Sequence, residues 1–407
     1  MKRVIVFALV LAMLAVTGTA WAETRILVGV NMELTGYSSG QGTEQYRGIL
    51  AAHHIQPTFT VGDTTYRIEF SVCDNQTLRE EAINCATRLA GESVVAVLGG
   101  FSSSMSIAAA PIYQERRLAQ ISTGATNPVL TQIGDYIFRI PFTDDFQSQT
   151  LAQYVYETLG ARRVVIFRQA DDDFSVGYTS LFQNAFQRLG GQVQVQSFNQ
   201  AAVDFSPQLN NARRFNPDVL VNAAFCQLAG PLVRQSRAMG LDQPWVGGDS
   251  LDSPTCTELA GEAFEGVQFT GFPELSQLAP DALERAGAVQ DAYFELYPSS
   301  VGFSGVTLAG SDAYGVIRAS IETAIRSGAD PADVARFRVA VRDALASIEG
   351  YPGVTGDITY AGTEGTPANR SMGLLVVRNV LPDGKYERDS MGYFLIGPDS
   401  TVFYPHE

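Results

Sequence analysis

Basic residues and histidine are scarce in this 407-residue chain. It has three histidines, and 28 lysines and arginines against 43 acidic residues, giving a formal net charge of −15 at pH 7. Nucleic acid and anionic membrane surfaces repel a chain of this sign, so we expect neither as a partner. The histidines are too few and too scattered for a metal site, and the cysteines lack C-x-x-C spacing. We therefore predict no metal and no cofactor.

Long apolar runs are also missing after the N-terminus, where none reaches the roughly 18 residues of a membrane-spanning helix. Residues 1–22 contain a basic pair at Lys2-Arg3, an apolar run from Val4 to Val16 and an Ala-x-Ala pattern that ends at Ala22. This pattern is typical of a secretory signal peptide, and we predict cleavage after Ala22. No cysteine follows that site, so we expect an exported chain without a lipid anchor.

Only four cysteines are present, and in an exported chain they predict disulfides. Four cysteines allow three connectivities. We favour pairing between sequence neighbours, Cys73 with Cys85 and Cys226 with Cys256, and the other two connectivities stay open.

Apolar β-branched runs alternate with helical patterns along the whole chain. A first set of predicted strands includes Ile26–Met32 and Tyr66–Asp74, and a second set begins at Val164–Gln169 and continues through Asp218–Ala224. Such alternation predicts an α/β protein with two open, largely parallel sheets, and the length fits two domains. Ligands of such sheets bind outside the carboxyl ends of the strands.

The segment from Val94 to Leu130 carries the clearest functional pattern. A buried-type strand ends in two glycines, three serines (Ser102–Ser104) precede a helical pattern, and a second strand runs into the polar loop Thr123–Pro128. Free N–H groups and hydroxyls at a helix start suit an anion. Neither loop contains lysine or arginine, which disfavours nucleotide phosphate and favours a small carboxylate. The alternative is that the serines only cap the helix.

The run GGFSSSMSIAAAPIY followed by ISTGATNP resembles the leucine/isoleucine/valine-binding protein family, the amino-acid receptors of ABC importers. The resemblance implies a type I periplasmic binding fold, with two Rossmann-like doubly wound lobes joined by a three-crossing hinge. Lobe 1 would comprise residues 23–141 and 273–350, and lobe 2 residues 142–272 and 351–407. It also implies that Ser103, Ala125 and Thr126 hold the α-carboxylate of the ligand.

Other predicted ligand contacts lie mainly in lobe 2. Asp249 follows PWVGG and matches an acid that pairs with the ligand ammonium in the family, although it could instead cap a following helix. Phe174 and Phe225 match aromatic positions, although either could be core. The family's best-known receptor has tyrosines at both positions, so the comparison implies a drier side-chain pocket in this chain. Gln41 would line the lobe 1 side.

A hydrolase motif competes with this interpretation. The segment Gly36–Gly40 matches G-x-S-x-G, with Ser38 as the nucleophile. The elbow follows the first predicted strand, and neither His53, His54 nor His406 is plausibly placed as its base. We therefore predict that the chain is not an enzyme.

The resemblance implies a periplasmic solute-binding protein that captures a small amino acid, branched-chain or related, between its lobes. It would deliver this ligand to an ABC permease in the membrane and act as a monomer. Two alternatives stay open: a receptor for an amide, urea or carboxylate compound, and a sensory ligand-binding protein.

Overall fold

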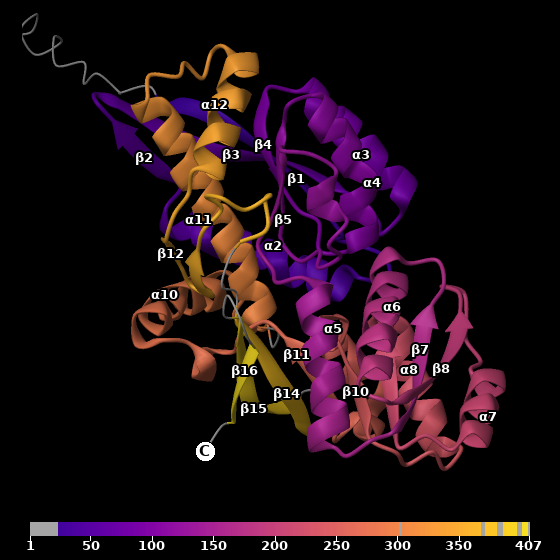
Figure 1. Ribbon diagram of the computed structural model, residues 1–407. Helices are drawn as coiled ribbons and strands as arrows, with labels where there is room; N and C mark the ends of the chain where they lie inside the picture. Colours follow the sequence, from indigo (N-terminus) through magenta and orange to yellow (C-terminus); the bar gives the residue numbers. More distant parts are fainter. Residues whose placement is uncertain (1–22, 301–302, 368–370, 381–385, 397–400, 406–407) are drawn as a thin grey trace, which may run out of the picture.

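The computed structural model describes residues 23–300, 303–367, 371–380, 386–396 and 401–405. Two α/β lobes lie one above the other, and the chain passes between them (Figure 1). The predicted signal peptide, residues 1–22, lies outside the described ranges. Within those ranges, helices lack the length and apolar character needed to cross a bilayer.

The upper lobe in Figure 1 is built on a six-stranded sheet in the order β2-β3-β1-β4-β5-β6. Neighbouring strands are parallel except β2, which pairs antiparallel with β3. The strands are β1 (Thr24–Met32), β2 (Thr58–Val61), β3 (Thr64–Asp74), β4 (Val94–Leu98), β5 (Ala119–Ser122) and β6 (Ile137–Arg139). Sequence analysis did not predict β2, because this short edge strand has no apolar run to mark it.

Helices cover both faces of this sheet. They are α2 (Ser39–Ile55), α3 (Arg79–Gly91), α4 (Ser103–Glu115), α10 (Pro280–Leu296), α11 (Gly305–Arg326) and α12 (Val334–Ala346). Strand β4 is buried on both faces: Val94 and Val97 pack in the core under α3 and α4, and Val95 and Leu98 pack in the core that includes α11 and α12. This two-sided burial explains why β4 is a continuous apolar run rather than an alternating one.

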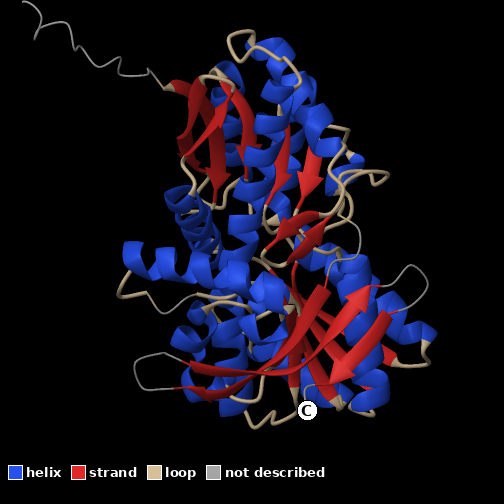
Figure 2. Cartoon of the chain, turned by 90° about the vertical axis from the view of Figure 1, so that its left-hand side faces the viewer, coloured by secondary structure: helices blue, strands red, loops and turns tan. Residues whose placement is uncertain are grey.

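The lower lobe is built on an eight-stranded sheet in the order β16-β15-β14-β11-β10-β9-β7-β8. Its strands are β7 (Arg163–Gln169), β8 (Gln192–Phe198), β9 (Val219–Ala223), β10 (Trp245–Gly247), β11 (Gln268–Gly271), β14 (Ser371–Val380), β15 (Tyr386–Ile396) and β16 (Thr401–Pro405). The first five are parallel, and the last three add as antiparallel strands. The helices are α5 (Asp144–Gln153), α6 (Asp173–Arg188), α7 (Ser206–Phe215), α8 (Cys226–Ala238) and α9 (Pro254–Ala260). Figure 2 shows helices around the strands of both lobes.

The parallel strands of the two sheets follow one topology. The order is β3-β1-β4-β5-β6 in the upper lobe and β8-β7-β9-β10-β11 in the lower lobe. In each sheet the winding direction therefore reverses beside the first strand, between β1 and β4 and between β7 and β9. Loops diverge at such a switch point and leave room for a ligand. The predicted fold class, two doubly wound α/β lobes, is confirmed.

Three connections join the lobes: one after β6, one after β11, and one before β14. The predicted lobe boundaries near 141 and 273 remain our proposal. For the third connection, β12 (Tyr351–Gly353) pairs with β13 (Gly356–Ile358) and contacts α10 and α11. The Tyr360 hydroxyl also donates to the Arg139 carbonyl at 2.7 Å. These contacts favour a boundary nearer β14 than the predicted one at residue 350.

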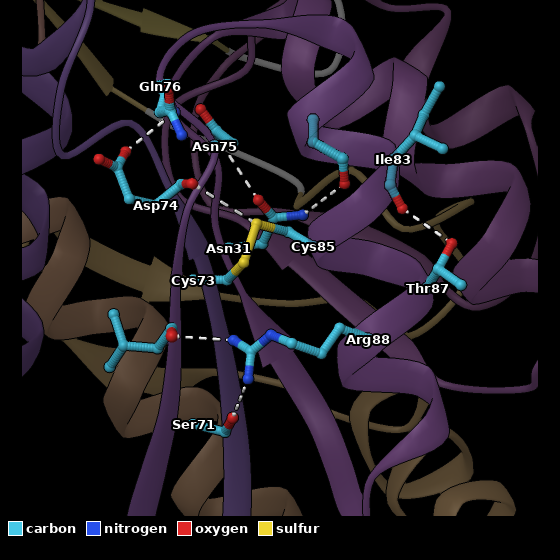
Figure 3. The surroundings of a disulfide bond; sticks show 12 residues. Asn31, Ser71, Cys73, Asp74, Asn75, Gln76, Ile83, Cys85, Thr87 and Arg88 are labelled. Atoms are coloured by element: carbon cyan, nitrogen blue, oxygen red, sulfur yellow. Dashed lines mark hydrogen bonds between the residues drawn. A yellow bond between two sulfur atoms is a disulfide. The ribbon is translucent and has the colours of Figure 1, made fainter.

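Both predicted disulfides are present, Cys73–Cys85 and Cys226–Cys256. The first joins the end of β3 to α3 (Figure 3). Beside it, the Asn31 side chain accepts a hydrogen bond from Asn75 at 3.2 Å. The second disulfide joins the starts of α8 and α9, two segments that follow strands of the lower sheet. The cross-links therefore brace loops at the carboxyl ends of both sheets.

Candidate functional site

The predicted site residues lie in loops or first helical turns that follow the central strands, and all of them are buried. They are Ser103 after β4, Ala125 and Thr126 after β5, Phe174 after β7, Phe225 after β9, Asp249 after β10, and Gln41 in the first turn of α2; each is at most 3% exposed. The loops belong to both lobes and meet across the cleft between them. Whether these residues touch a ligand stays a prediction.

The first turn of α4 is the polar wall of the upper lobe. Ser102 is the residue before the helix, and its side chain makes no capping hydrogen bond. Its Oγ is buried and has no hydrogen-bond partner within the described ranges. The Ser103 Oγ accepts from the Asn127 N–H at 3.2 Å, which leaves its hydroxyl hydrogen free to donate. Simple helix capping therefore does not account for these two hydroxyls.

A buried arginine shapes the neighbouring loop. The Arg139 guanidinium donates to the carbonyls of Ala125 at 2.8 Å and Asn127 at 2.9 Å. The Ala125 N–H is already donated to Ser122 Oγ at 3.0 Å. Burial lowers the pKa of Arg139 to about 10, so the group still carries its charge at neutral pH. Arg139 therefore fixes the loop from behind rather than facing the cleft as an anion receptor.

Asp249 is held in the lower lobe by a side-chain amide that sequence analysis did not single out. Gln147 Nε2 donates to Asp249 Oδ1 at 2.8 Å and to Asp144 Oδ1 at 3.1 Å. The same amide accepts at its Oε1 from the Asp249 N–H at 2.8 Å. Asp249 does not cap α9, because Ser253 takes that position and accepts from Thr255 N–H. The carboxylate is therefore held in place by a side chain of α5.

Asp144 and Asp249 are two buried carboxyl groups without a cationic partner in the described ranges. Burial raises the pKa of Asp249 to about 7. Burial also raises the pKa of Asp144, and the nearby charge of Asp249 raises it further. Asp144 Oδ2 and the Tyr178 hydroxyl are buried and have no hydrogen-bond partner among described residues. A positively charged group in this corner would stabilise both carboxylates.

Aromatic rings from both lobes meet in the middle of the cleft. The ring centroid of Phe225 lies 5.5 Å from Tyr37, 6.0 Å from Phe101 and 5.7 Å from Phe174. Phe174 also packs against Tyr178 at 5.4 Å. The two predicted phenylalanines therefore belong to one cluster that spans the lobes, and the structure adds Phe101 and Tyr178 to it. Such rings can enclose an alkyl chain or face a cation.

Direct hydrogen bonds also cross between the lobes. Gln41 Nε2 donates to the Ser250 carbonyl at 2.8 Å. At the opposite rim, the Tyr37 hydroxyl donates to Asp172 Oδ2 at 3.1 Å. Arg79 forms an ion pair with Asp173 at 2.7 Å. The lobes are therefore in a closed arrangement, with Gln41 acting between them rather than only lining one wall.

The serine of the hydrolase motif bonds a threonine, and His406, one of its three candidate bases, lies outside the described residues. Ser38 Oγ donates to Thr77 Oγ1 at 3.4 Å. The His53 ring bonds the Ile68 carbonyl at 2.9 Å and stacks near Phe70. A general base within reach of Ser38 is needed for nucleophilic catalysis, and His53 is engaged elsewhere.

Several site residues escaped sequence analysis: Glu33, Asp144, Gln147, Asp172 and Tyr178. Their common signal is a polar residue immediately after a strand or in the first turns of the helix that follows it. Glu33 and Asp172 follow β1 and β7, the first strands of the two sheets. These two residues could have been identified from their place in the sequence, directly after the first strand of each sheet, because ligand-facing loops gather at the switch point beside that strand.

A hollow between the lobes has a cavity volume of about 570 Å³ and lies between α2, α9 and the end of α10, away from the predicted ligand contacts. Its lining includes Glu44 and Arg47, which pair at 2.7 Å. Among the described residues, no cluster of three His, Cys, Asp or Glu side chains is placed to hold a metal ion.

Comparisons with known proteins agree on the family. The family model described as periplasmic binding protein matches residues 26–384. The Leu/Ile/Val-binding protein homolog 1 of Brucella suis is 26% identical over 365 residues, covering 87% of this chain and 94% of the relative. The leucine-specific-binding protein of Salmonella typhimurium is 28% identical over 214 residues, 51% of this chain and 56% of the relative.

Solved structures share the whole architecture. The leucine-binding protein LivK of Thermotoga maritima is 30% identical with a TM-score of 0.80, covering 92% of this chain and 99% of that one. A Rhodopseudomonas palustris solute-binding protein in complex with 4-hydroxybenzoate is 19% identical with a TM-score of 0.78, covering 92% and 98%. This second likeness concerns the fold alone. The chain therefore belongs to the periplasmic binding protein family, as a type I member related to the leucine/isoleucine/valine-binding proteins.

Proposed function

We propose that the protein captures a small amino acid, or a close amine-bearing derivative, between its lobes and delivers it to an ABC permease. The observation that carries this proposal is the pair of buried carboxylates, Asp144 and Asp249, which are joined by Gln147 and form no ion pair within the described ranges. A buried charge without a partner is costly, and a ligand ammonium would remove that cost.

The opposite end of the ligand would meet the upper lobe. Ser103 can donate its hydroxyl hydrogen, and the first N–H groups of α4 have no partner within the helix. Ala125 and Thr126 would complete this wall, as the family resemblance implies. Phe174 and Phe225 would then enclose the side chain of the ligand. Both rings lack a hydroxyl group, so the surface they offer is apolar. An aliphatic side chain suits such a surface.

Closure would couple capture to delivery. Ser103 belongs to the upper lobe and Asp249 to the lower lobe, so a ligand bound by both stabilises the closed arrangement by its differential affinity. A permease that recognises the closed surface would therefore receive loaded protein in preference to empty protein. The relatives are named as binding proteins. The same non-enzymatic role is proposed for this chain.

The test is a ligand screen. The protein is first unfolded, freed of any ligand carried over from expression, and then refolded. We expect amines with an aliphatic side chain, such as leucine, valine and their derivatives, to raise the melting temperature and to give heat in titration calorimetry. Sugars and 4-hydroxybenzoate serve as controls and should be silent. Binding of 4-hydroxybenzoate together with silence of every amine would contradict the proposal, because that anion has no ammonium for Asp249.

A further inference from the structure

Two carboxylates of the protein already occupy the start of α4. Glu33 is fully buried, and its carboxylate accepts from the Phe101 N–H at 2.8 Å and the Ser102 N–H at 3.2 Å. Asp172 from the lower lobe accepts from Ser104 Oγ at 2.7 Å. The N–H groups of the two residues before the helix, and the hydroxyl of its second residue, therefore already bond carboxylates of the protein.

Arg79 lies near Asp172 and also donates to Ser104 Oγ at 3.3 Å, whereas Glu33 forms no ion pair within the described ranges. Of the nearby arginines, Arg139 bonds only carbonyl oxygens and the Thr131 hydroxyl, and Arg79 is paired with Asp173. The charges of Glu33 and Asp172 both act on the Tyr37 hydroxyl, which is not basic. Glu33, Asp144, Asp172 and Asp249 are thus buried carboxyl groups that form no ion pair within the described ranges.

Glu33 also has little freedom to move away. A Cβ added at Gly100 would lie 2.5 Å from Glu33 Oε1, so the loop before α4 is wrapped closely over the carboxylate. Burial raises the pKa of Glu33 to about 7, and the two backbone N–H groups act in the opposite direction. The group is thus substantially ionised slightly above neutral pH.

A ligand carboxylate at Ser103 would be the third negative charge at this helix start. A neutral carbonyl or amide would accept from Ser103 and could bond Ser102 Oγ, which is buried without a partner, and would meet no repulsion. We propose that Glu33 is a specificity-determining residue that selects amines whose oxygen-bearing end is uncharged, such as amino-acid amides, over free amino acids. This inference rests on the proposed function, because it assumes that an amine-bearing ligand binds between the lobes.

The experiment compares matched pairs of ligands by titration calorimetry at about pH 7.5: leucine with leucinamide, alanine with alaninamide, and phenylalanine with phenylalaninamide. For the native sequence we expect the amide of the preferred pair to bind at least about ten-fold more tightly than the acid, equivalent to about 1.4 kcal/mol. Glu33→Gln should reduce that ratio at least about ten-fold, chiefly because the free amino acid binds better.

Two further variants separate this effect from general charge and from folding defects. Asp172→Asn removes the second carboxylate at the helix start and should shift the ratio in the same direction. Asp63→Asn removes an exposed charge in the turn between β2 and β3 and should leave the ratio unchanged.

The outcomes are distinct. A free amino acid that binds as tightly as its amide, or a ratio unaffected by both Glu33→Gln and Asp172→Asn, overturns the inference and leaves the proposed function standing. If no member of any pair binds, the proposed function itself fails, and the inference fails with it.

Discussion

Replacing Asp249 with asparagine should make the protein more stable and at the same time a weaker receptor. Asparagine keeps an Oδ1 acceptor for Gln147 Nε2, so the local geometry survives while the charge is lost. The two effects have opposite signs because Asp249 is desolvated in the ligand-free protein and is paired only when an ammonium is bound. Such a trade is typical of functional sites.

The stability term follows from linkage. Burial raises the pKa of Asp249 from 3.8 to about 7, so the folded protein binds this proton more tightly than the unfolded chain does. A carboxyl group with a raised pKa stabilises the fold fully below its unfolded pKa and loses that contribution as pH rises through about 7. At about pH 8 the charged group therefore costs at most about 4 kcal/mol, at 1.36 kcal/mol per pKa unit.

The same substitution should weaken ligand binding. A charge-assisted hydrogen bond to an ammonium contributes about 1.5–3 kcal/mol, so Asp249→Asn should weaken amine binding about 10- to 150-fold. For the native sequence, affinity should fall as pH drops below about 7, because Asp249 must release its proton to pair with the ligand. The variant should show a much flatter pH dependence.

The assay is thermal denaturation and titration calorimetry between about pH 5 and pH 8.5, with Asp242→Asn as an exposed control in the loop before β10. We expect Asp249→Asn to melt several degrees higher than the native protein at pH 8, with the difference shrinking to less than half toward pH 5. A variant that melts lower at pH 8, or binds the cognate amine with native affinity, would refute the reasoning.

Two further predictions concern closure and cross-linking. Gly40 touches the lower lobe, where an added Cβ would lie 2.6 Å from Ser253 Oγ, so Gly40→Val should weaken ligand binding in calorimetry about 5- to 150-fold. Gly287→Val, whose Cβ would meet nothing within 4 Å, should leave ligand affinity unchanged. Equal ligand affinities of the two variants would contradict the closure argument. Replacing Cys226 and Cys256 with serine opens a loop of sequence separation 30 and should cost about 3–4 kcal/mol in chemical denaturation. Removing the other disulfide, which has a sequence separation of 12, should reduce the free energy of unfolding by less. A larger loss for this shorter loop than for the longer one would contradict the estimate.

Some features of the site could be read from neighbouring residues alone. The run from Val94 to Leu98 predicts a strand buried on both faces, and Ser102–Ser104 predict the helix that follows it. The disulfides also followed from sequence proximity, as the pairing Cys73–Cys85 illustrates. These predictions succeeded because each depends on short-range geometry, such as strand periodicity, helix starts and short loops.

The lobe to which the chain belongs after residue 350 was harder to predict, because the sequence of a short strand does not indicate which lobe it contacts. β12 contacts α10 and α11, elements that precede it in the chain, and β2 is a polar edge strand that periodicity does not reveal. Edge and connecting strands are specified by their neighbours more than by their own composition.

The chain by itself determined which loops end its strands and which residue types stand there, because hydrophobic alternation and glycine or serine at strand ends are local properties. Only the tertiary structure decided how these residues act on one another. Gln147 reaches Asp249 across 102 positions, and Glu33 reaches Phe101 across 68. The carboxylates lose their water through contacts between segments far apart in the sequence, so their charge state is a property of the fold rather than of the sequence pattern.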